Sequence, residues 1–166
     1  MNTNDTPILD RLLRHDRDTT LELIEIAMRL EARALERDFE IGPGSVRRTL
    51  DHIVRAMECW TDLMLAKPQR ERLSLDAPLA DLAARLHAVG DELLALGKKL
   101  AAEGRLDHCF VDTLDDPPKE KTFGGALVHV ATHGMHHRAQ VLFMLRQLGV
   151  EGLPEGDALG WERRQR

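Results

Sequence analysis

Apolar residues recur at helical spacing in four segments of the chain, and strand-type alternation is sustained nowhere. The first segment opens at Thr6-Pro7, where a capping residue precedes a proline at the first helical position, and it predicts a helix to about Phe39. Its apolar stripe is interrupted at Asp16 and Thr20, so one patch of the inward face is expected to be polar. The pattern therefore predicts an all-α protein.

The other three segments are each preceded by a residue that can cap a helix and followed by glycine or proline. They predict helices over 45–67, 76–104 and 122–148. Residues 105–121 lack a helical period and contain adjacent prolines, so we expect a long connection there that can cross the bundle. The predicted fold is one domain over 1–166, a four-helix bundle with this long connection between helices three and four.

Composition and charge narrow the function classes. A chain of 166 residues with 43% hydrophobic content can build a full core without disulfides. Four Phe, two Trp and no Tyr disfavour an all-β fold and also a base-stacking surface for single-stranded nucleic acid. The balance of 23 Lys+Arg against 28 Asp+Glu argues against a polyanion as the main partner. We therefore expect no nucleic-acid partner.

The cysteines and the apolar segments indicate the cellular compartment of the protein. Cys59 and Cys109 are far apart and form no CxxC motif, so they are interpreted as two reduced thiols of a cytosolic protein. The N-terminal residues lack the basic and apolar regions of a signal peptide, and no segment approaches the length of a membrane span. The sequence thus predicts a soluble, cytoplasmic protein with no membrane partner.

Four of the eight histidines fall within residues 129–137, in the segment VHVATHGMHHRAQV. His129, His133 and His137 are spaced i, i+4 and i+8, so they share one face of the fourth helix. That face is otherwise apolar, and its imidazoles are therefore expected to point into the bundle. His136 is turned by about 100° and is expected at the edge.

Imidazoles that face an apolar interior are costly without partners, and a transition metal would remove that cost. Two histidines at i and i+4 can bind one ion, and a third ligand from another helix completes the set. His52 is the natural third, since its column on the second helix is apolar; the alternative is an ordinary surface or hydrogen-bonded histidine. Gly134 stands where an HExxH motif needs glutamate, so the base of a metalloprotease is missing. His15, His87 and His108 have no assigned role.

Two segments, SVRRTLDHIVRAMECW and TFGGALVHVATHGMHHRAQVLFMLRQLG, the latter followed by LPEGDAL, carry a family resemblance. They resemble the DinB/YfiT-like superfamily of metal-dependent helical proteins, and the resemblance covers nearly the whole chain. It implies a four-helix bundle, often dimeric, with a metal site between helices two and four. Carried over by position, the ligands of a divalent metal, zinc or nickel, would be His52, His133 and His137.

The same resemblance leaves three residues as candidates for the surroundings of the metal. His129, one turn before the ligand pair, is expected to hydrogen-bond a ligand or line the cavity, with packing in the core as the alternative. Asp16 and Thr20, the polar break in the first helix, are candidates for contact with a ligand or a substrate. The alternative for both is a solvent-exposed position.

Arg138 and Gln140 belong to the matching motif of the last helix, in which Ala139 stands where the family usually has glycine. Arg138 points away from the ligand face. It is expected to fix the C-terminal segment or a subunit contact, with Asp157 as its partner, and an ordinary solvated arginine is the alternative.

Three neutral imidazoles leave a coordination position open, which is typical of catalytic rather than structural zinc. A metal-bound thiol would be deprotonated, and bound water would have its pKa lowered toward about 7. Since relatives include thiol S-transferases and a thiol-dependent isomerase, the resemblance implies a metal-dependent enzyme that transfers a small thiol to an electrophile. Hydrolysis by bound hydroxide is one alternative. A non-catalytic metal-binding protein of the stress response, in which the ion stabilises the fold, is the other.

Overall fold

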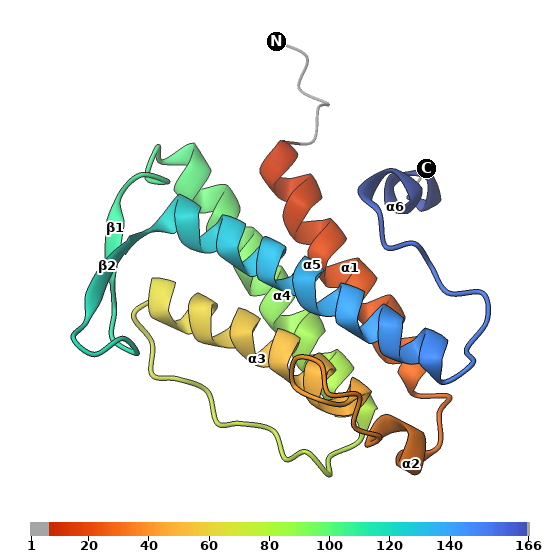
Figure 1. The fold of residues 1–166 in the computed structure, drawn as a ribbon. Coiled ribbons are helices and arrows are strands. Elements are labelled where there is room, and N and C mark those ends of the chain that lie inside the picture. Colours follow the sequence, from red (N-terminus) through yellow and green to blue (C-terminus); the bar gives the residue numbers. More distant parts are fainter. Residues whose placement is uncertain (1–6, 166) are drawn as a thin grey trace.

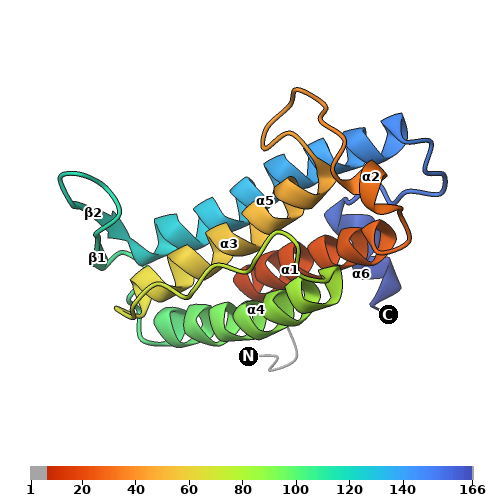
Figure 2. The ribbon, with the colours of Figure 1, turned by 90° about the horizontal axis from the view of Figure 1, so that it is seen from below.

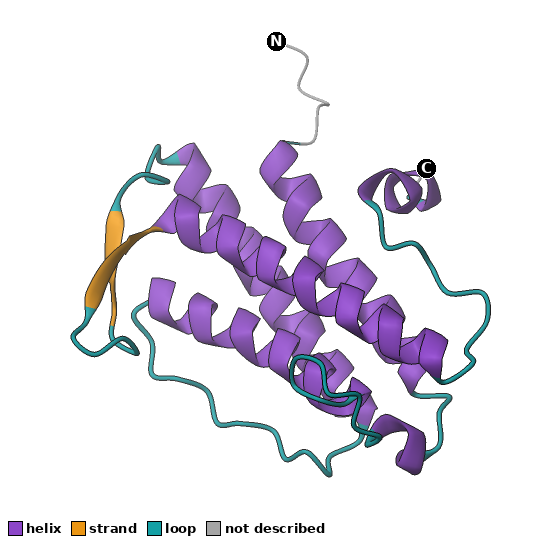
Figure 3. Ribbon diagram, viewed as in Figure 1, coloured by secondary structure: helices purple, strands orange, loops and turns teal. Residues whose placement is uncertain are grey.

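Four long helices account for most of the computed structural model, which describes residues 7–165 (Figures 1 and 3). Within that range there are six helices and one two-stranded antiparallel sheet. The elements are α1 (Ile8–Ala27), α2 (Ala32–Leu35), α3 (Val46–Met64), α4 (Leu79–Ala102), β1 (Cys109–Asp112), β2 (Lys119–Thr122), α5 (Phe123–Gln147) and α6 (Ala158–Arg164). The protein is thus mostly helical, as the sequence predicts.

The long helices pack side by side, with α1 and α3 each in contact with both α4 and α5. Figure 2 shows α3 and α5 alongside one another, with α1 and α4 beneath them. Leucine, isoleucine, valine and methionine side chains from all four helices fill the space between them. Fully buried examples are Ile24, Leu50, Leu86, Val89, Met144 and Leu145. Burial of this apolar surface holds α3 and α5 together along their length, and the candidate site lies between these two helices.

The expected bounds of the last three long helices agree with the structure to within three residues at each end. Two of the predicted caps are present. The Ser45 hydroxyl accepts a hydrogen bond from the Arg48 amide at 3.2 Å, and the Thr122 hydroxyl accepts one from the Gly125 amide at 3.1 Å. The caps fix where α3 and α5 begin, and so set the height of each histidine along its helix.

The prediction of one helix as far as Phe39 is wrong. Helix α1 ends at Ala27, and the short α2 follows after a turn. Residues 31–40 contain six charged residues and lack an apolar stripe that could pack inward, so the chain leaves the helical path. At the start of α1, Pro7 precedes the first helical residue, while the predicted cap Thr6 lies outside the described residues.

The long connection predicted over 105–121 is present, and most of it forms the hairpin β1–β2, which the sequence pattern does not predict (Figure 3). Its strands have four residues each, too few to show an alternating pattern in the sequence. Phe110 anchors the hairpin, since its ring contacts those of Trp60 and Phe123 at centroid distances of 6.5 and 5.2 Å. The hairpin therefore lies against the C-terminal end of α3 and the N-terminal end of α5.

Helix α6 is a second element that the sequence pattern does not predict. Its only strongly buried side chain is that of Trp161, whose indole N–H donates to the Asp18 carboxylate at 3.1 Å. The Asp157 carboxylate caps the helix by accepting from the Gly160 amide at 2.7 Å. One tryptophan and one cap thus attach the C-terminal segment to α1. Throughout residues 7–165, every helix is too short or too polar to span a lipid bilayer.

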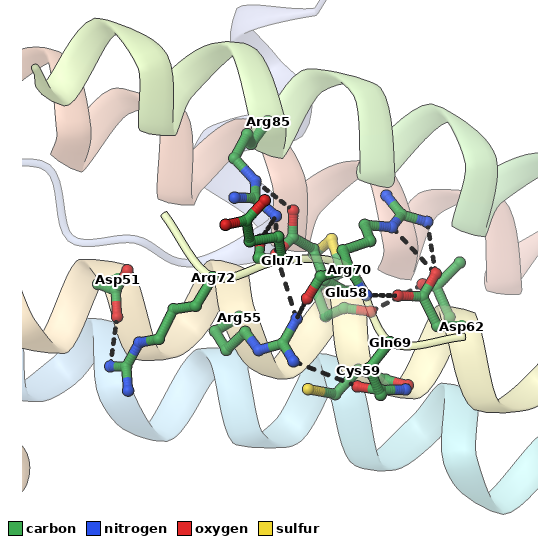
Figure 4. Close-up of polar contacts among 12 residues, drawn as sticks. Asp51, Arg55, Glu58, Cys59, Asp62, Gln69, Arg70, Glu71, Arg72 and Arg85 are labelled. Carbon is green, nitrogen blue, oxygen red and sulfur yellow. Dashed lines mark hydrogen bonds and ion pairs between the residues drawn. The ribbon is translucent and has the colours of Figure 1, made fainter. Parts of the chain in front are cut away.

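The segment between α3 and α4 is held over α3 by ion pairs (Figure 4). Three carboxylates of α3 that are less than 5% exposed each face an arginine of this segment or of α4. The pairs are Asp51 with Arg72 at 2.9 Å, Glu58 with Arg85 at 2.6 Å and Asp62 with Arg70 at 2.9 Å. These carboxylates therefore contribute to structure, since a buried charge without a partner would be strongly destabilising.

Candidate metal centre

Three histidines from two helices converge between α3 and α5. His52 comes from the middle of α3, and His133 and His137 come from consecutive turns of α5. One ring nitrogen from each residue lies within 4.8 Å of the others. The Nε2 atoms of His52 and His133 are only 3.1 Å apart. The structure thus brings together the three residues that the family resemblance implies as ligands.

Local structure explains this convergence. The spacing of four residues between His133 and His137 places their rings one above the other, at a centroid distance of 4.5 Å. The ring of His52 lies 4.9 Å from that of His133 and 4.5 Å from that of His137, since α3 packs alongside α5 at this point. His137 is 9% exposed and the other two are half-buried. The cluster therefore lies at the edge of the helix interface, with access to solvent.

Gln140 fixes the orientation of His137. The Nδ1 of His137 donates to the side-chain oxygen of Gln140 at 2.8 Å, which leaves Nε2 as the nitrogen with a free lone pair. The amide nitrogen of Gln140 lies 3.0 Å from the Nε2 of His136 and donates to it. Gly42 backs this amide at a φ of +54°, and a Cβ at that position would overlap the Gln140 oxygen. The turn after α2 thus supports a candidate ligand of α5.

The three imidazoles are neutral at neutral pH. Burial lowers the pKa of His133 to about 4, with a further contribution from His137 and His52. Burial and the nearby His137 lower the pKa of His52. Burial also lowers the pKa of His137, against the opposing effect of its hydrogen bond to Gln140. Each ring therefore presents an unprotonated nitrogen, the form in which histidine binds metals.

The donor set fits a divalent transition metal. Three imidazole nitrogens bound to one tetrahedral ion would lie roughly 3.3 Å apart. The 3.1 Å between the nitrogens of His52 and His133 is already close to this value, and a ring nitrogen of His137 lies within 4.8 Å of both residues' ligand atoms. Among the described residues, no Cys, Asp or Glu joins the cluster. The three histidines alone would therefore hold the ion, and coordination positions would remain for other molecules.

Replacing Gln140 with leucine is expected to weaken metal affinity by 10- to 100-fold, in the range of about 1.4 to 2.8 kcal/mol. The variant keeps the size of the side chain but removes the acceptor that orients the His137 ring. Titration of the metal-free protein with zinc against a competing chelator measures the change. Replacing Gln147, on the exposed end of the same helix, with leucine is the matched control and should leave the affinity unchanged. Equal affinities for both variants would contradict this role of Gln140.

Two further histidines lie beside the cluster. The ring of His129 is 5.5 Å from that of His133 and 5.1 Å from that of Trp60, so it separates the cluster from the hairpin end of the helices. Among the described residues it forms no hydrogen bond with the three candidate ligands, and it lines a cavity. His129 is exposed, so the expectation that it points into the bundle is wrong, and so is the alternative of packing in the core. His136 is exposed, as expected for an edge residue.

The structure places Asp16 and Thr20 against Arg138 and not against the histidines. The guanidinium of Arg138 forms an ion pair with the Asp16 carboxylate and donates to the Thr20 hydroxyl at 3.2 Å. The expectation that Arg138 would pair with Asp157 is therefore wrong, since that carboxylate caps α6. Gly134 allows the pair to form, because a Cβ there would overlap the Asp16 carboxylate. Arg138 thus joins α5 to α1.

One supporting residue escapes sequence reasoning. The glycines of the turn at 42–44 indicate only a stop to the preceding helix, and nothing in the pattern relates Gly42 to Gln140, almost a hundred residues later. Gln140 stands out only as part of a family motif. Its contact with His137 follows from a spacing of three on one helix and could have been found from that spacing.

Fold and site together define a mostly helical protein with a three-histidine candidate metal centre between two of its long helices. The family model described as the DinB family matches residues 1–160, and the chain belongs to that family. No curated protein matches the chain.

Proposed function

We propose that this DinB family protein is a metal-dependent enzyme that activates a low-molecular-weight thiol for transfer to an electrophile. The observation that carries the proposal is the convergence of His52, His133 and His137, a cluster that no Asp, Glu or Cys of residues 7–165 joins. Neutral donors leave the double charge of the ion uncompensated, which favours binding of an anionic group from outside the protein. The four long helices, in this proposal, are the four-helix bundle of the family.

When bound, the metal would lower the pKa of a thiol, or of water, that occupies a remaining coordination position. Zinc and nickel are the ions that we favour, and imidazole suits both. The protein's own part is to hold three nitrogens in place. Gln140 keeps the Nε2 of His137 turned to the site, and the helix interface keeps His52 opposite His133. In the reaction the thiol gives its proton to solvent, its sulfur forms a bond to the electrophilic carbon, and the leaving group departs with the electron pair of the broken bond.

The proposed assembly is a cytoplasmic homodimer that acts on small molecules. Val128, Met135 and Phe143 are 52%, 58% and 43% exposed, and their spacing places them on one outer face of α5. An exposed apolar stripe of this kind supports a contact with a second copy of the chain. Cys59 and Cys109 are both free, which supports a reducing compartment.

The test is a screen of small thiols, including cysteine and glutathione, against chlorodinitrobenzene, with formation of the thioether followed by absorbance. We expect turnover with at least one thiol, loss of turnover on treatment with a chelator, and recovery when zinc or nickel is added back. Chelator-sensitive hydrolysis of an ester without any thiol would replace S-transfer by hydrolysis. A protein that contains its metal but turns over no substrate would instead be a non-catalytic metal-binding protein.

A further inference from the structure

A cavity of about 430 Å³ adjoins the candidate metal centre on its hairpin side. It lies between the C-terminal end of α3, strand β2 and the first turns of α5. The residues that line it are Trp60, Glu120, Lys121, Thr122, Gly125, Ala126 and His129. A cavity of roughly 150 Å³ is enough to bind benzene, so this one has room for a substituted aromatic ring.

The cavity is lined by an aromatic side chain, Trp60, and by two small residues, Gly125 and Ala126. The indole of Trp60 is half-buried and is held by near-perpendicular contacts with the rings of Phe110 and His129, at 85° and 66°. Gly125 has no side chain to fill the cavity, and the only atom within 4 Å of a Cβ built there is the Thr122 hydroxyl oxygen. Aromatic side chains pack favourably on aromatic groups in offset or edge-to-face arrangements. The cavity is therefore suited to a flat aromatic ligand.

The hairpin supplies a positive charge at the same cavity. Lys121 stands directly opposite Phe110 in the antiparallel register, so both side chains lie on the face of the hairpin that meets Trp60. Glu120 also lines the cavity, but it stands opposite Val111, on the other face of the hairpin, and it is more exposed than Lys121. Of the two charged residues that line the cavity, Lys121 is therefore the one that extends from the hairpin face next to Trp60.

Lys121 can exchange its present partner for a ligand. Its ammonium pairs with the half-buried Asp115 at 3.2 Å, and Lys119 pairs with the same carboxylate at 3.5 Å. Asp115 would keep one lysine if Lys121 turned toward a bound anion. The first amides of α5 are already occupied, since Phe123 and Gly124 donate to the carbonyls of His108 and Leu106. Recognition of an anion here would thus depend on the lysine side chain.

We propose that this cavity binds an aromatic carboxylate, with its ring against Trp60 and its carboxylate on Lys121. The far end of such a molecule faces His129, whose ring lies 5.5 Å from that of the candidate ligand His133. The role of the bound acid as the electrophile rests on the proposed function, whereas its binding does not. The cavity is then the subsite that selects the electrophile.

The test is calorimetric titration of the metal-loaded protein with para-nitrobenzoate and with its uncharged analogue para-nitrobenzamide. We expect the acid to bind more tightly than the amide. Lys121→Gln should weaken binding of the acid by about tenfold and leave binding of the amide unchanged. Lys119→Gln, which removes the other lysine that pairs with Asp115 but does not line the cavity, should change neither. Trp60→Leu should weaken binding of both compounds.

Equal binding of the acid by the Lys121→Gln variant and the original protein, or no saturable binding of the acid at all, would overturn the proposal. Lys121 lies on the surface hairpin, so its variant is expected to fold even if Trp60→Leu does not. The two proposals fail separately. Binding of the acid without chelator-sensitive turnover overturns the function alone, and turnover that is accompanied by no binding of the acid overturns the subsite alone.

Discussion

Replacing Arg138 with methionine is expected to lower the free energy of unfolding by about 3–5 kcal/mol. Arg138 is 4% exposed and pairs with Asp16, which is 1% exposed. The second carboxylate oxygen of Asp16 has no hydrogen-bond partner among the described residues, so Arg138 is the only ion-pair partner of this carboxylate in that part of the chain. Removal of the guanidinium would therefore leave a buried carboxylate without compensation, and urea denaturation monitored by circular dichroism would measure the loss.

The controls separate the buried charge from the loss of side-chain packing. Arg164→Met breaks the exposed ion pair between Arg164 and Glu22 and should cost no more than about 1 kcal/mol. Replacing Asp16 with leucine in the Arg138→Met variant removes both charges and should restore much of the stability. If Arg138→Met alone cost as little as Arg164→Met, the ion pair would have no structural importance.

The stability deficit of the Arg138→Met variant should also shrink in acid. Burial raises the pKa of the Asp16 carboxyl, and Arg138 opposes that rise. Without Arg138 the pKa rises further above its value in the unfolded chain, so the folded variant binds a proton more tightly than the unfolded one. Stability then falls as pH rises through this range, and the variant should lie closer to the original protein at about pH 4 than at pH 7. A deficit that grows in acid would contradict this account.

The polar patch in α1 shows how far sequence reasoning reaches. The break at Asp16 and Thr20 can be predicted from helical periodicity alone, because the apolar stripe that it interrupts belongs to a single helix. Its partner Arg138 lies 122 positions later, and only the packing of α1 against α5 brings the two together. Periodicity gives the face of a helix but not which residue of a neighbouring helix lies at the same height.

The candidate centre was more accessible to prediction. The spacing of His133 and His137 is local and is fixed by helix geometry, and the family motif implied His52 as their neighbour. The sequence pattern does not predict the hairpin, helix α6 or the contact between Gly42 and Gln140. Four-residue strands and a seven-residue helix carry too little pattern, and the close approach of Gly42 depends on how a turn folds back on α5.

Replacing His133 with alanine is expected to reduce the metal content of the dialysed protein from about one ion per chain to below about a tenth of that. His133 lies close to both other members of the cluster, with its Nε2 3.1 Å from that of His52 and its ring 4.5 Å from that of His137. Two imidazoles from different helices would remain, without the third donor that a stable site needs. Inductively coupled plasma mass spectrometry measures the metal content, and circular dichroism checks that the variant is folded.

His136→Ala is the matched control for this prediction. His136 lies in the same turn of α5 and is also a histidine, but it is exposed and its nitrogen is bonded to the Gln140 amide rather than turned to the cluster. Its variant should keep close to one ion per chain, since the three candidate ligands and the oxygen of Gln140 remain. Full metal content in His133→Ala would show that the ion is bound elsewhere. Equal losses in both variants would indicate binding by the histidine-rich surface of α5 as a whole rather than by a defined three-histidine centre.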